Sequence, residues 1–321
     1  MLQFVKNTLI LTVLPIFLLL SGCSFMPDPW QGLPGKIKVL VSFPPIYSLV
    51  KSIAGDRAAV ISICTTTGPH DYTFNAQDTI LLRKADLFFY NGLDLDNLFV
   101  ERLSKDASNP KLQFCRLSNK IPKSQRIETK EIKTGPHAGH NHGSFDPHLW
   151  LGMTQVLLMI NAIRDELSSI DPEGAEAYKL SAANLYAEVE QIQKDGKSAL
   201  ENKKNKVMVT FHESLSYMAS SFGIEIAGVI QKAPGGEPNS PELAAIVKLC
   251  LDKRPSFIAV EPQYPRSSSA KLLQEELKKK GLEIPLVEID PLETCIPNEL
   301  AAGWFEKKYK QNLEALTKNF Q

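Results

Sequence analysis

Histidine is the residue of this sequence with the clearest chemical potential, because a neutral imidazole is a common ligand of divalent metal ions. The chain has 321 residues and six histidines, and each histidine lies in a connection between apolar runs rather than inside one. The six are His70, His137, His140, His142, His148 and His212. A single exposed histidine is usually only a polar surface residue, so its context decides whether it is a candidate ligand.

Three candidate ligands follow apolar, β-branched runs that we predict to be strands. His70 ends a Thr-Gly-Pro-His segment soon after one run, and His212 and Asp290 each come directly after another. In open α/β sheets, ligands bind beyond the carboxyl ends of the strands. His148 stands in an Asp-Pro-His-Leu-Trp segment that is stiffened by its proline. We therefore expect these four side chains to bind one ion in a cleft between two lobes, with two ligands from each lobe.

The expected donor set favours zinc. Three imidazole nitrogens and one carboxylate oxygen suit tetrahedral Zn²⁺, with bond lengths of about 2.0–2.2 Å. Mn²⁺ prefers more oxygen ligands, but the order of intrinsic affinities does not fix selectivity in a cell. The sequence therefore predicts a zinc site and leaves Mn²⁺ and Fe²⁺ as alternatives.

The elements that must position these residues form a pattern that occurs twice. Short β-branched and aromatic runs alternate with amphipathic stretches, which is typical of βα units with a mainly parallel sheet. The predicted strands are 39–43, 59–64, 87–90 and 112–115, then 207–211, 224–229, 257–260 and 285–289. The predicted helices are 47–54, 76–84 and 95–103, then 214–222, 241–251 and 267–280. We predict an α/β fold of two lobes, each with a mainly parallel four-stranded sheet flanked by helices.

A long amphipathic stretch lies between the two halves. It begins at Pro172, a favourable first-turn residue, and its apolar positions recur at helical spacing, although Gly196 interrupts the stripe. A helix over 172–203 would measure about 48 Å at 1.5 Å per residue, long enough to act as a rigid connection. We therefore predict an N-terminal lobe at 38–171, this helix as the link, and a C-terminal lobe at 204–321.

The N-terminus has the features of an export signal. Lys6 precedes an apolar stretch at 9–20, and Leu-Ser-Gly-Cys follows, which resembles a bacterial lipobox that ends in Cys23. We expect removal of residues 1–22, a lipid anchor at Cys23, and a tether at 23–37. An uncleaved anchor or a simple secretory signal is the alternative, but the run is short for a span of about 20 residues. The protein is expected to be exported, as a periplasmic or cell-surface lipoprotein.

Charge and cysteine content exclude some classes of protein and of metal site. Basic and acidic residues both number 36, so the sequence lacks the excess of positive charge that is typical of nucleic-acid-binding proteins. The four cysteines other than Cys23 show no C-x-x-C spacing, which argues against a cysteine zinc site. We predict a disulfide between Cys250 and Cys295, with four buried thiols as the alternative.

Two further groups are auxiliary candidates. The polar segment 128–143 contains His137, His140 and His142, which could collect zinc weakly or form an ordinary polar loop. Glu261 ends a predicted strand and could accept a hydrogen bond from a ligand imidazole, or be a solvated strand-end carboxylate.

Short motifs follow one another along the chain in a specific order. They occupy residues 68–72 (GPHDY), 85–93 (ADLFFYNGL), 146–150 (DPHLW), 211–213 (FHE), 237–243 (EPNSPEL), 261–263 (EPQ) and 290–292 (DPL). Together they resemble the solute-binding proteins of zinc and manganese ABC uptake systems, over nearly the whole chain after the signal. The resemblance implies two lobes joined by a rigid helix and metal ligation by His70, His148, His212 and Asp290.

The resemblance also implies a monomeric binding protein that delivers its ion to a membrane permease with a separate cytoplasmic ATPase. In this family the third ligand is His or Glu, and manganese binders often have Glu, so His212 favours zinc. Family members commonly carry Glu at the position of Thr73, which leaves the hydrogen bonding around His70 open to change. Some zinc binders have a long His-rich loop before the second ligand, and 134–143 resembles a short version.

Two other classes of protein remain as alternatives. A zinc hydrolase needs an open coordination position, whereas four protein ligands close the tetrahedron. His212-Glu213 begins like the H-E-x-x-H motif, but Ser216 stands where the second histidine belongs, and no phosphate-binding loop or nucleophile elbow occurs. The second alternative is a structural or adhesive lipoprotein in which the metal stabilises the fold. We predict a binding protein rather than an enzyme.

Overall fold

The computed structural model describes residues 28–129, 144–231, 237–263 and 268–321. The predicted signal peptide with Cys23 and the loop histidines His137, His140 and His142 lie outside these residues.

Both lobes contain a parallel four-stranded sheet, which confirms the predicted fold class. The N-terminal sheet has the order β2-β1-β3-β4, and the C-terminal sheet has the order β6-β5-β7-β8. The strands of the first sheet are β1 Ile37–Val41, β2 Ala58–Ser62, β3 Leu87–Tyr90 and β4 Gln113–Arg116. Those of the second are β5 Val207–Thr210, β6 Glu225–Val229, β7 Phe257–Val260 and β8 Leu286–Glu288. In each lobe the chain crosses from one side of the first strand to the other, which creates a switch point at its carboxyl end.

The predicted helices of both lobes are present, with small shifts at their ends. They are α1 Pro44–Ala54, α2 Ala76–Lys84, α3 Asn97–Ala107, α6 Ser216–Phe222, α7 Ser240–Lys253 and α8 Ser268–Lys279. Two of them begin with a capping box, in which Asn75 or Asn239 accepts a hydrogen bond from the first turn while an acidic side chain reaches back. These reciprocal bonds fix the starts of α2 and α7, which lie within one residue of the predicted starts.

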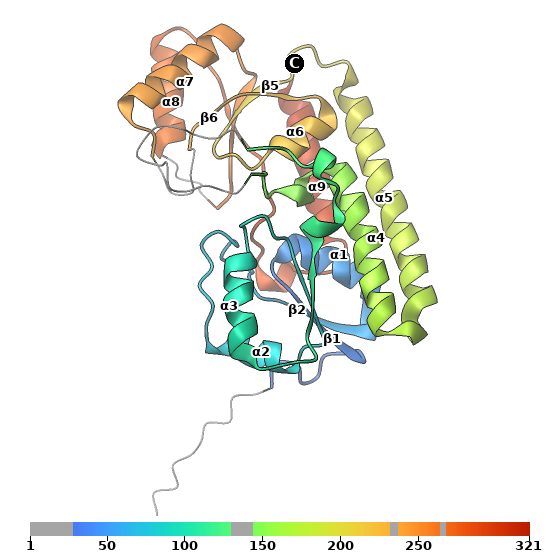
Figure 1. Cartoon of the computed structure of the whole chain (residues 1–321). Helices are drawn as coiled ribbons and strands as arrows, with labels where there is room; N and C mark the ends of the chain where they lie inside the picture. The colour runs from blue at the N-terminus through green and yellow to red at the C-terminus, as the bar shows by residue number, and fades with distance from the viewer. Residues whose placement is uncertain (1–27, 130–143, 232–236, 264–267) are drawn as a thin grey trace, which may run out of the picture.

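The connection between the lobes is a helical hairpin. The long helix α5, Ala175–Glu201, follows a short turn at Pro172–Gly174 and packs antiparallel against α4, Met153–Ile170. Helix α5 also contacts α1 of the N-terminal lobe and α6 of the C-terminal lobe, so it runs along both lobes (Figure 1). Its 27 residues span about 40 Å. The sequence analysis predicted α5 but did not identify α4 as its partner.

A second helix crosses between the lobes at the C-terminal end of the chain. Helix α9, Trp304–Asn319, contacts α1, α5 and β8 (Figure 1). Its first turn is fixed to the N-terminal lobe, because the Phe305 backbone N–H donates to Ser48 Oγ at 3.0 Å. This helix was also missed from the sequence, and it proves important for the metal centre.

The cysteines do not pair as predicted. Cys64, Cys115, Cys250 and Cys295 are all buried free thiols. Cys250 belongs to a hydrophobic cluster confined to the C-terminal lobe, whereas Cys295 belongs to the larger cluster that continues through the junction into the N-terminal lobe. The predicted disulfide is therefore wrong, because proximity in the sequence did not place the two residues in one cluster. Burial raises the pKa of the Cys250 thiol to about 11.

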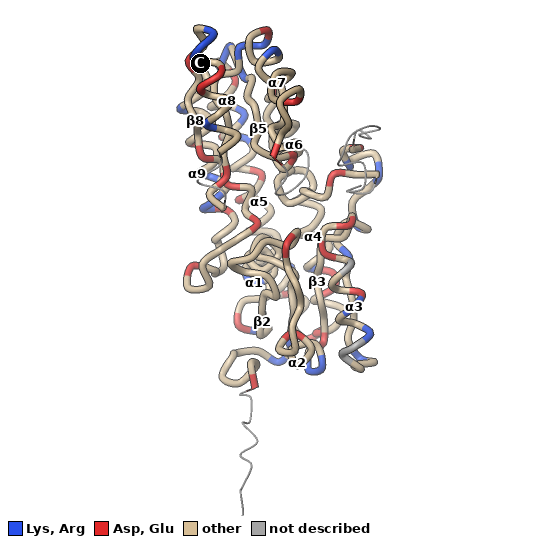
Figure 2. The backbone as a smooth tube through the Cα atoms, turned by 90° about the vertical axis from the view of Figure 1, so that its left-hand side faces the viewer, with Lys and Arg blue, Asp and Glu red and all other residues tan. Residues whose placement is uncertain are grey.

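Charged residues do not collect on one face of the described molecule. Basic and acidic positions are interspersed over both lobes (Figure 2). No helix within the described ranges is long and apolar enough to cross a membrane.

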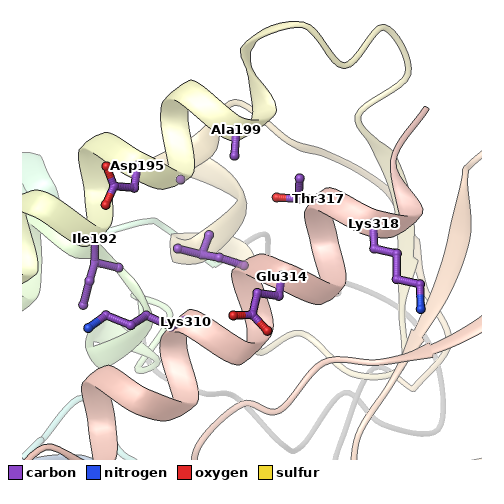
Figure 3. A pocket seen from close by; sticks show the side chains of 9 residues that line it. Ile192, Asp195, Ala199, Lys310, Glu314, Thr317 and Lys318 are labelled. Atoms are coloured by element: carbon purple, nitrogen blue, oxygen red, sulfur yellow. The ribbon is translucent and has the colours of Figure 1, made fainter.

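Gly196 interrupts the apolar stripe of α5 without ending the helix. A Cβ atom at this position would lie 2.6 Å from Phe222 Cε1 and 3.0 Å from the Leu313 methyl groups. Phe222 and Leu313 are both buried, so the glycine allows α6 and α9 to approach α5 closely. Gly196 and Leu313 also line a groove of about 490 Å³ between α5 and α9, together with charged side chains such as Asp195 and Lys310 (Figure 3).

Replacement of Gly196 by alanine is expected to destabilise the protein, although alanine is the better helix former. Overpacking typically lowers the free energy of unfolding by about 1–3 kcal/mol. The higher helix propensity of alanine raises it by about 1 kcal/mol. We expect a net loss of about 1 kcal/mol, seen as a fall of roughly 2–4 °C in the melting temperature of the metal-free protein. Ser198→Ala, at an exposed position in the same turn, is the control and should not lower it. A higher melting temperature for Gly196→Ala would contradict the close packing.

Candidate metal centre

Three imidazoles and one carboxylate meet at the junction between the lobes. One ligand atom from each of His70, His148, His212 and Glu293 lies within 4.8 Å of all the others. The Nε2 atoms of His70 and His148 are 3.4 Å apart, and Glu293 Oε1 lies 3.6 Å from the first and 3.5 Å from the second. His212 Nε2 is 3.9 Å from the same oxygen. Tetrahedral ligands at about 2.0–2.1 Å from Zn²⁺ are roughly 3.3–3.4 Å apart, so a modest contraction would fit the ion.

Two of these buried atoms have no hydrogen-bond partner among the described residues. They are His212 Nε2 and Glu293 Oε1, and both face the centre of the cluster. An unsatisfied buried polar atom is costly and therefore rare in folded proteins. A cation at the centre would satisfy both atoms.

The segment between β2 and α2 carries His70. The Cys295 backbone N–H donates to Thr65 O at 2.9 Å, which joins this segment to the one that carries Glu293. A Cβ atom at Gly68 would lie 3.2 Å from Glu293 Oε2. Because Gly68 has no side chain, the backbone two residues before His70 can approach the Glu293 carboxylate closely.

A single carboxylate oxygen orients His148. Asp146 Oδ1 accepts from the backbone N–H of His148 at 2.8 Å and pairs with its ring Nδ1 at 2.7 Å. With Nδ1 committed in this way, Nε2 is the atom left for a metal. The segment is held on one side by Asn91 Nδ2, which donates to Pro147 O at 2.9 Å, and on the other by the Tyr217 hydroxyl, which donates to Asp146 O at 3.1 Å.

His212 is oriented in the same manner from the other lobe. It follows β5, and its Nδ1 pairs with Oε1 of Glu261, which follows the neighbouring strand β7. This is the switch point of the C-terminal sheet, where ligands of α/β folds bind. Glu261 also accepts from Ser214 Oγ at 3.2 Å and Gln263 Nε2 at 3.0 Å. Its carboxylate is thereby fixed before any metal arrives.

Asp290, which we expected among the ligands, lies outside the cluster. Its Oδ1 accepts from the Leu292 backbone N–H at 2.8 Å, and its Oδ2 lies 3.5 Å from Lys308 Nζ. The chain turns sharply after β8, because Leu292 has a φ of +64°, and this turn brings Glu293 to the imidazoles instead. The sequence analysis missed Glu293. The available signal was that Glu293 is the one acidic residue in the stretch 291–298, close to the apolar Leu292 and Cys295.

Trp150 connects the two ligand-bearing turns. Its indole is fully buried, packs edge-on against Phe43 with ring centroids 4.6 Å apart, and lies 5.2 Å from the His148 ring. Its Nε1 donates to Pro291 O at 2.7 Å. The residue is thus both a core anchor and one wall of the site.

The electrostatics of the cluster favour a cation. Burial opposes the protonation of His148, but the carboxylates of Asp146 and Glu293 outweigh it and raise the pKa of the imidazole to about 10. The pKa of His212 is raised as well, since Glu261 and Glu293 outweigh the opposing effect of burial. Burial would raise the pKa of Glu293, but the surrounding imidazoles hold it well below its ordinary value. Without metal, His148 therefore carries a proton in place of a bound cation.

Comparison with known proteins places the chain among metal-binding proteins of one family. The family model described as the periplasmic component A of zinc-uptake complexes matches residues 39–320. The chain is 27% identical over 294 residues to the zinc-binding protein AdcA of Streptococcus pyogenes serotype M1, which covers 88% of this chain and 56% of that protein. It therefore spans about half the length of this relative. It is 22% identical over 302 residues to the manganese-binding lipoprotein MntA of Bacillus subtilis strain 168, covering 93% and 94% of the two chains.

Solved structures show the same fold. The solute-binding protein FpvC of Pseudomonas aeruginosa, in complex with Mn²⁺, superposes with a TM-score of 0.76 at 24% identity, covering 89% of this chain and 98% of that one. The AdcAII protein of Streptococcus pneumoniae gives a TM-score of 0.72 at 25% identity, covering 89% and 99%. Because the family model covers nearly the whole chain, this protein belongs to the ZnuA family, the periplasmic component A of zinc-uptake complexes.

Proposed function

We propose that this chain is the extracytoplasmic substrate-binding protein of an ABC metal importer, which captures one Zn²⁺ ion and passes it to a membrane permease. The proposed ligands are Nε2 of His70, His148 and His212 together with the carboxylate of Glu293. The convergence of these four atoms on one point, three of them from buried residues and one from the partly buried His70, carries the proposal, because their spacings are close to those of a tetrahedral zinc site.

The donor set supports zinc over manganese. Three nitrogen donors and one oxygen donor suit Zn²⁺, whereas Mn²⁺ prefers sites richer in oxygen. The relatives named above bind either metal, so the fold alone does not select the ion. Mn²⁺ and Fe²⁺ are the competing ions to be tested.

Four protein ligands leave no open position for a catalytic water, which argues for binding rather than hydrolysis. Each lobe also has its own sheet and buried apolar residues, so the fold does not depend on a metal staple. A carrier must release its ion, and this architecture supports release without unfolding. The ATPase that drives transport would be a separate cytoplasmic subunit, because the sequence has no phosphate-binding loop.

The remaining parts of the proposal concern where and how the protein works. A lipid anchor at Cys23 would hold a monomer at the membrane, near its permease. The tether expected at 23–37 would be shorter at its C-terminal end, because Trp30 is buried and its Nε1 donates to Leu81 O at 3.3 Å, and because β1 begins at Ile37. The two crossing helices α5 and α9 would limit movement between the lobes to a small closure. The loop histidines, His137, His140 and His142, would act as an auxiliary zinc collector outside the main site.

Metal titration of the purified protein without its signal segment tests the proposal. We expect one tightly bound Zn²⁺ per chain, by elemental analysis and by competition with a chelator, and weaker binding of Mn²⁺ and Fe²⁺. Removal of the metal by a chelator should leave the far-ultraviolet circular dichroism spectrum unchanged, because the core does not require the ion. Unfolding on chelation would instead favour a structural zinc.

Glu261→Gln should weaken zinc binding although Glu261 does not belong to the ligand cluster. The substitution replaces the charged acceptor of His212 Nδ1 by a neutral amide. Loss of such a partner of a ligand imidazole typically lowers metal affinity about 10–100-fold. His212→Ala should abolish tight binding, whereas deletion of 135–143 should leave it nearly intact. Glu275→Gln, at an exposed site on α8, is the matched control. If the loop deletion weakened binding more than His212→Ala, the ligand assignment would be wrong.

Acid should weaken zinc binding, and binding should release protons. The pKa of His148 is about 10 in the metal-free site, so this imidazole is protonated at neutral pH, and the pKa of His212 is raised as well, whereas a ligand imidazole must be neutral. Each displaced proton lowers the affinity about tenfold per pH unit as the pH falls below the metal-free pKa. Calorimetry between pH 8 and pH 6, in buffers of different ionisation enthalpy, would measure the release. An affinity independent of pH over this range would contradict the imidazole site.

A further inference from the structure

The turn that brings Glu293 to the cluster has an unusual backbone. Leu292, the residue directly before it, has a φ of +64°. Residues other than glycine rarely adopt this left-handed conformation, and when they do so near a functional site the surroundings impose it. The Leu292 side chain is fully buried, so packing is one part of those surroundings. The other part is a set of hydrogen bonds to the two preceding residues.

Asp290 supplies the first of these hydrogen bonds. Its Oδ1 accepts from the Leu292 backbone N–H at 2.8 Å, closing a small ring across the turn. Local bonds of this kind are typical of aspartate and stabilise turns that other residues do not favour. The carboxylate is largely buried, since only 14% of the side chain is exposed, and it is therefore committed to the turn rather than to solvent.

Helix α9 holds Asp290 in place. Asn312 is 4% exposed and pairs with both peptide groups of Asp290: its Oδ1 accepts from the Asp290 N–H at 2.9 Å, and its Nδ2 donates to Asp290 O at 2.7 Å. Lys308, one helical turn earlier on the same face, places Nζ 3.5 Å from Asp290 Oδ2. The same helix is fixed to the N-terminal lobe through Phe305. The turn is thus held by an element that spans both lobes.

Pro291 completes the arrangement from the other side. Its carbonyl oxygen accepts from Trp150 Nε1, and Trp150 lies two residues after His148. The turn before Glu293 and the turn after His148 are therefore joined directly. Each residue from 290 to 292 has a defined partner, and none of these three belongs to the group of ligand atoms.

We propose that Asp290 is a positioning residue of the metal site: its carboxylate, anchored by Asn312, holds the left-handed turn at Leu292 that directs Glu293 toward the imidazoles. The inference deepens the proposed function and rests on it. Without the acceptor at residue 290, the Leu292 N–H loses its partner and the backbone can relax to an ordinary φ. Glu293 would then move away, while the three histidines, on other segments, stay in place.

Substitutions at residue 290 separate a positioning role from a ligand role. Asp290→Asn keeps an oxygen that can accept from the Leu292 N–H, so its zinc affinity should stay within about threefold of the unaltered chain, whereas Asp290→Ala should lose about tenfold or more. Glu288→Gln, which removes an exposed carboxylate two residues earlier, is the control and should have no effect. Affinity would be measured by chelator competition. Equal losses for the asparagine and alanine variants would overturn the proposal.

A double-mutant cycle with Glu293→Ala excludes a merely structural effect. If Asp290 acts through Glu293, Asp290→Ala should change the zinc affinity by less than about threefold once Glu293 is absent. A loss as large as in the unaltered background would mean that Asp290 acts independently of Glu293, and the proposal would fail. Absence of stoichiometric zinc in the unaltered chain would overturn the proposed function itself, which distinguishes the two failures.

Discussion

The junction between the lobes depends on the burial of three imidazoles and a carboxylate around a single point. Two of their atoms, His212 Nε2 and Glu293 Oε1, lack a hydrogen-bond partner in the described part of the chain. The Nδ1 atoms of His148 and His212 are held by Asp146 and Glu261, so these rings cannot turn away to find other partners. Such a cluster is costly unless a proton or a metal ion neutralises it. The surrounding structure maintains the cluster by fixing the rings of His148 and His212.

That fixing comes from elements that cross the junction. The larger hydrophobic cluster runs from the N-terminal sheet through α4, α5 and α9 into the C-terminal lobe. Tyr217 on α6 donates to the segment that carries His148, and Tyr309 on α9 donates to Leu151 O at 2.7 Å just after it. A ligand that belongs by sequence to the first lobe is therefore held by residues from both lobes. The geometry of the site is a property of the interlobe packing rather than of either sheet alone.

The sequence predicted those features that have local signatures. The strands are marked by β-branched runs, and the edge of the sheet on which the ligands lie follows from the parallel order of the strands. The fourth ligand, Glu293, could not be predicted from a local signature. A strand-end rule identifies Asp290, but the path of the chain beyond it depends on a left-handed leucine that has no local signature. Helices α4 and α9 were missed although both are amphipathic, as α5 is. The cysteines were mispaired because tertiary packing, which spacing along the chain does not reveal, decides which thiols meet.

The positions of the acidic residues also bear on metal choice. Three carboxylates lie at the cluster, but Asp146 and Glu261 are committed to imidazole Nδ1 atoms, and Glu261 holds Ser214 and Gln263 as well. Only Glu293 offers an oxygen to the centre. A metal that prefers six oxygen-rich ligands would have to break these bonds to recruit a second carboxylate, whereas a tetrahedral ion uses the set as it stands. The hydrogen bonds that orient the imidazoles therefore also limit the number of oxygen donors, which favours zinc even in a fold whose relatives bind other metals.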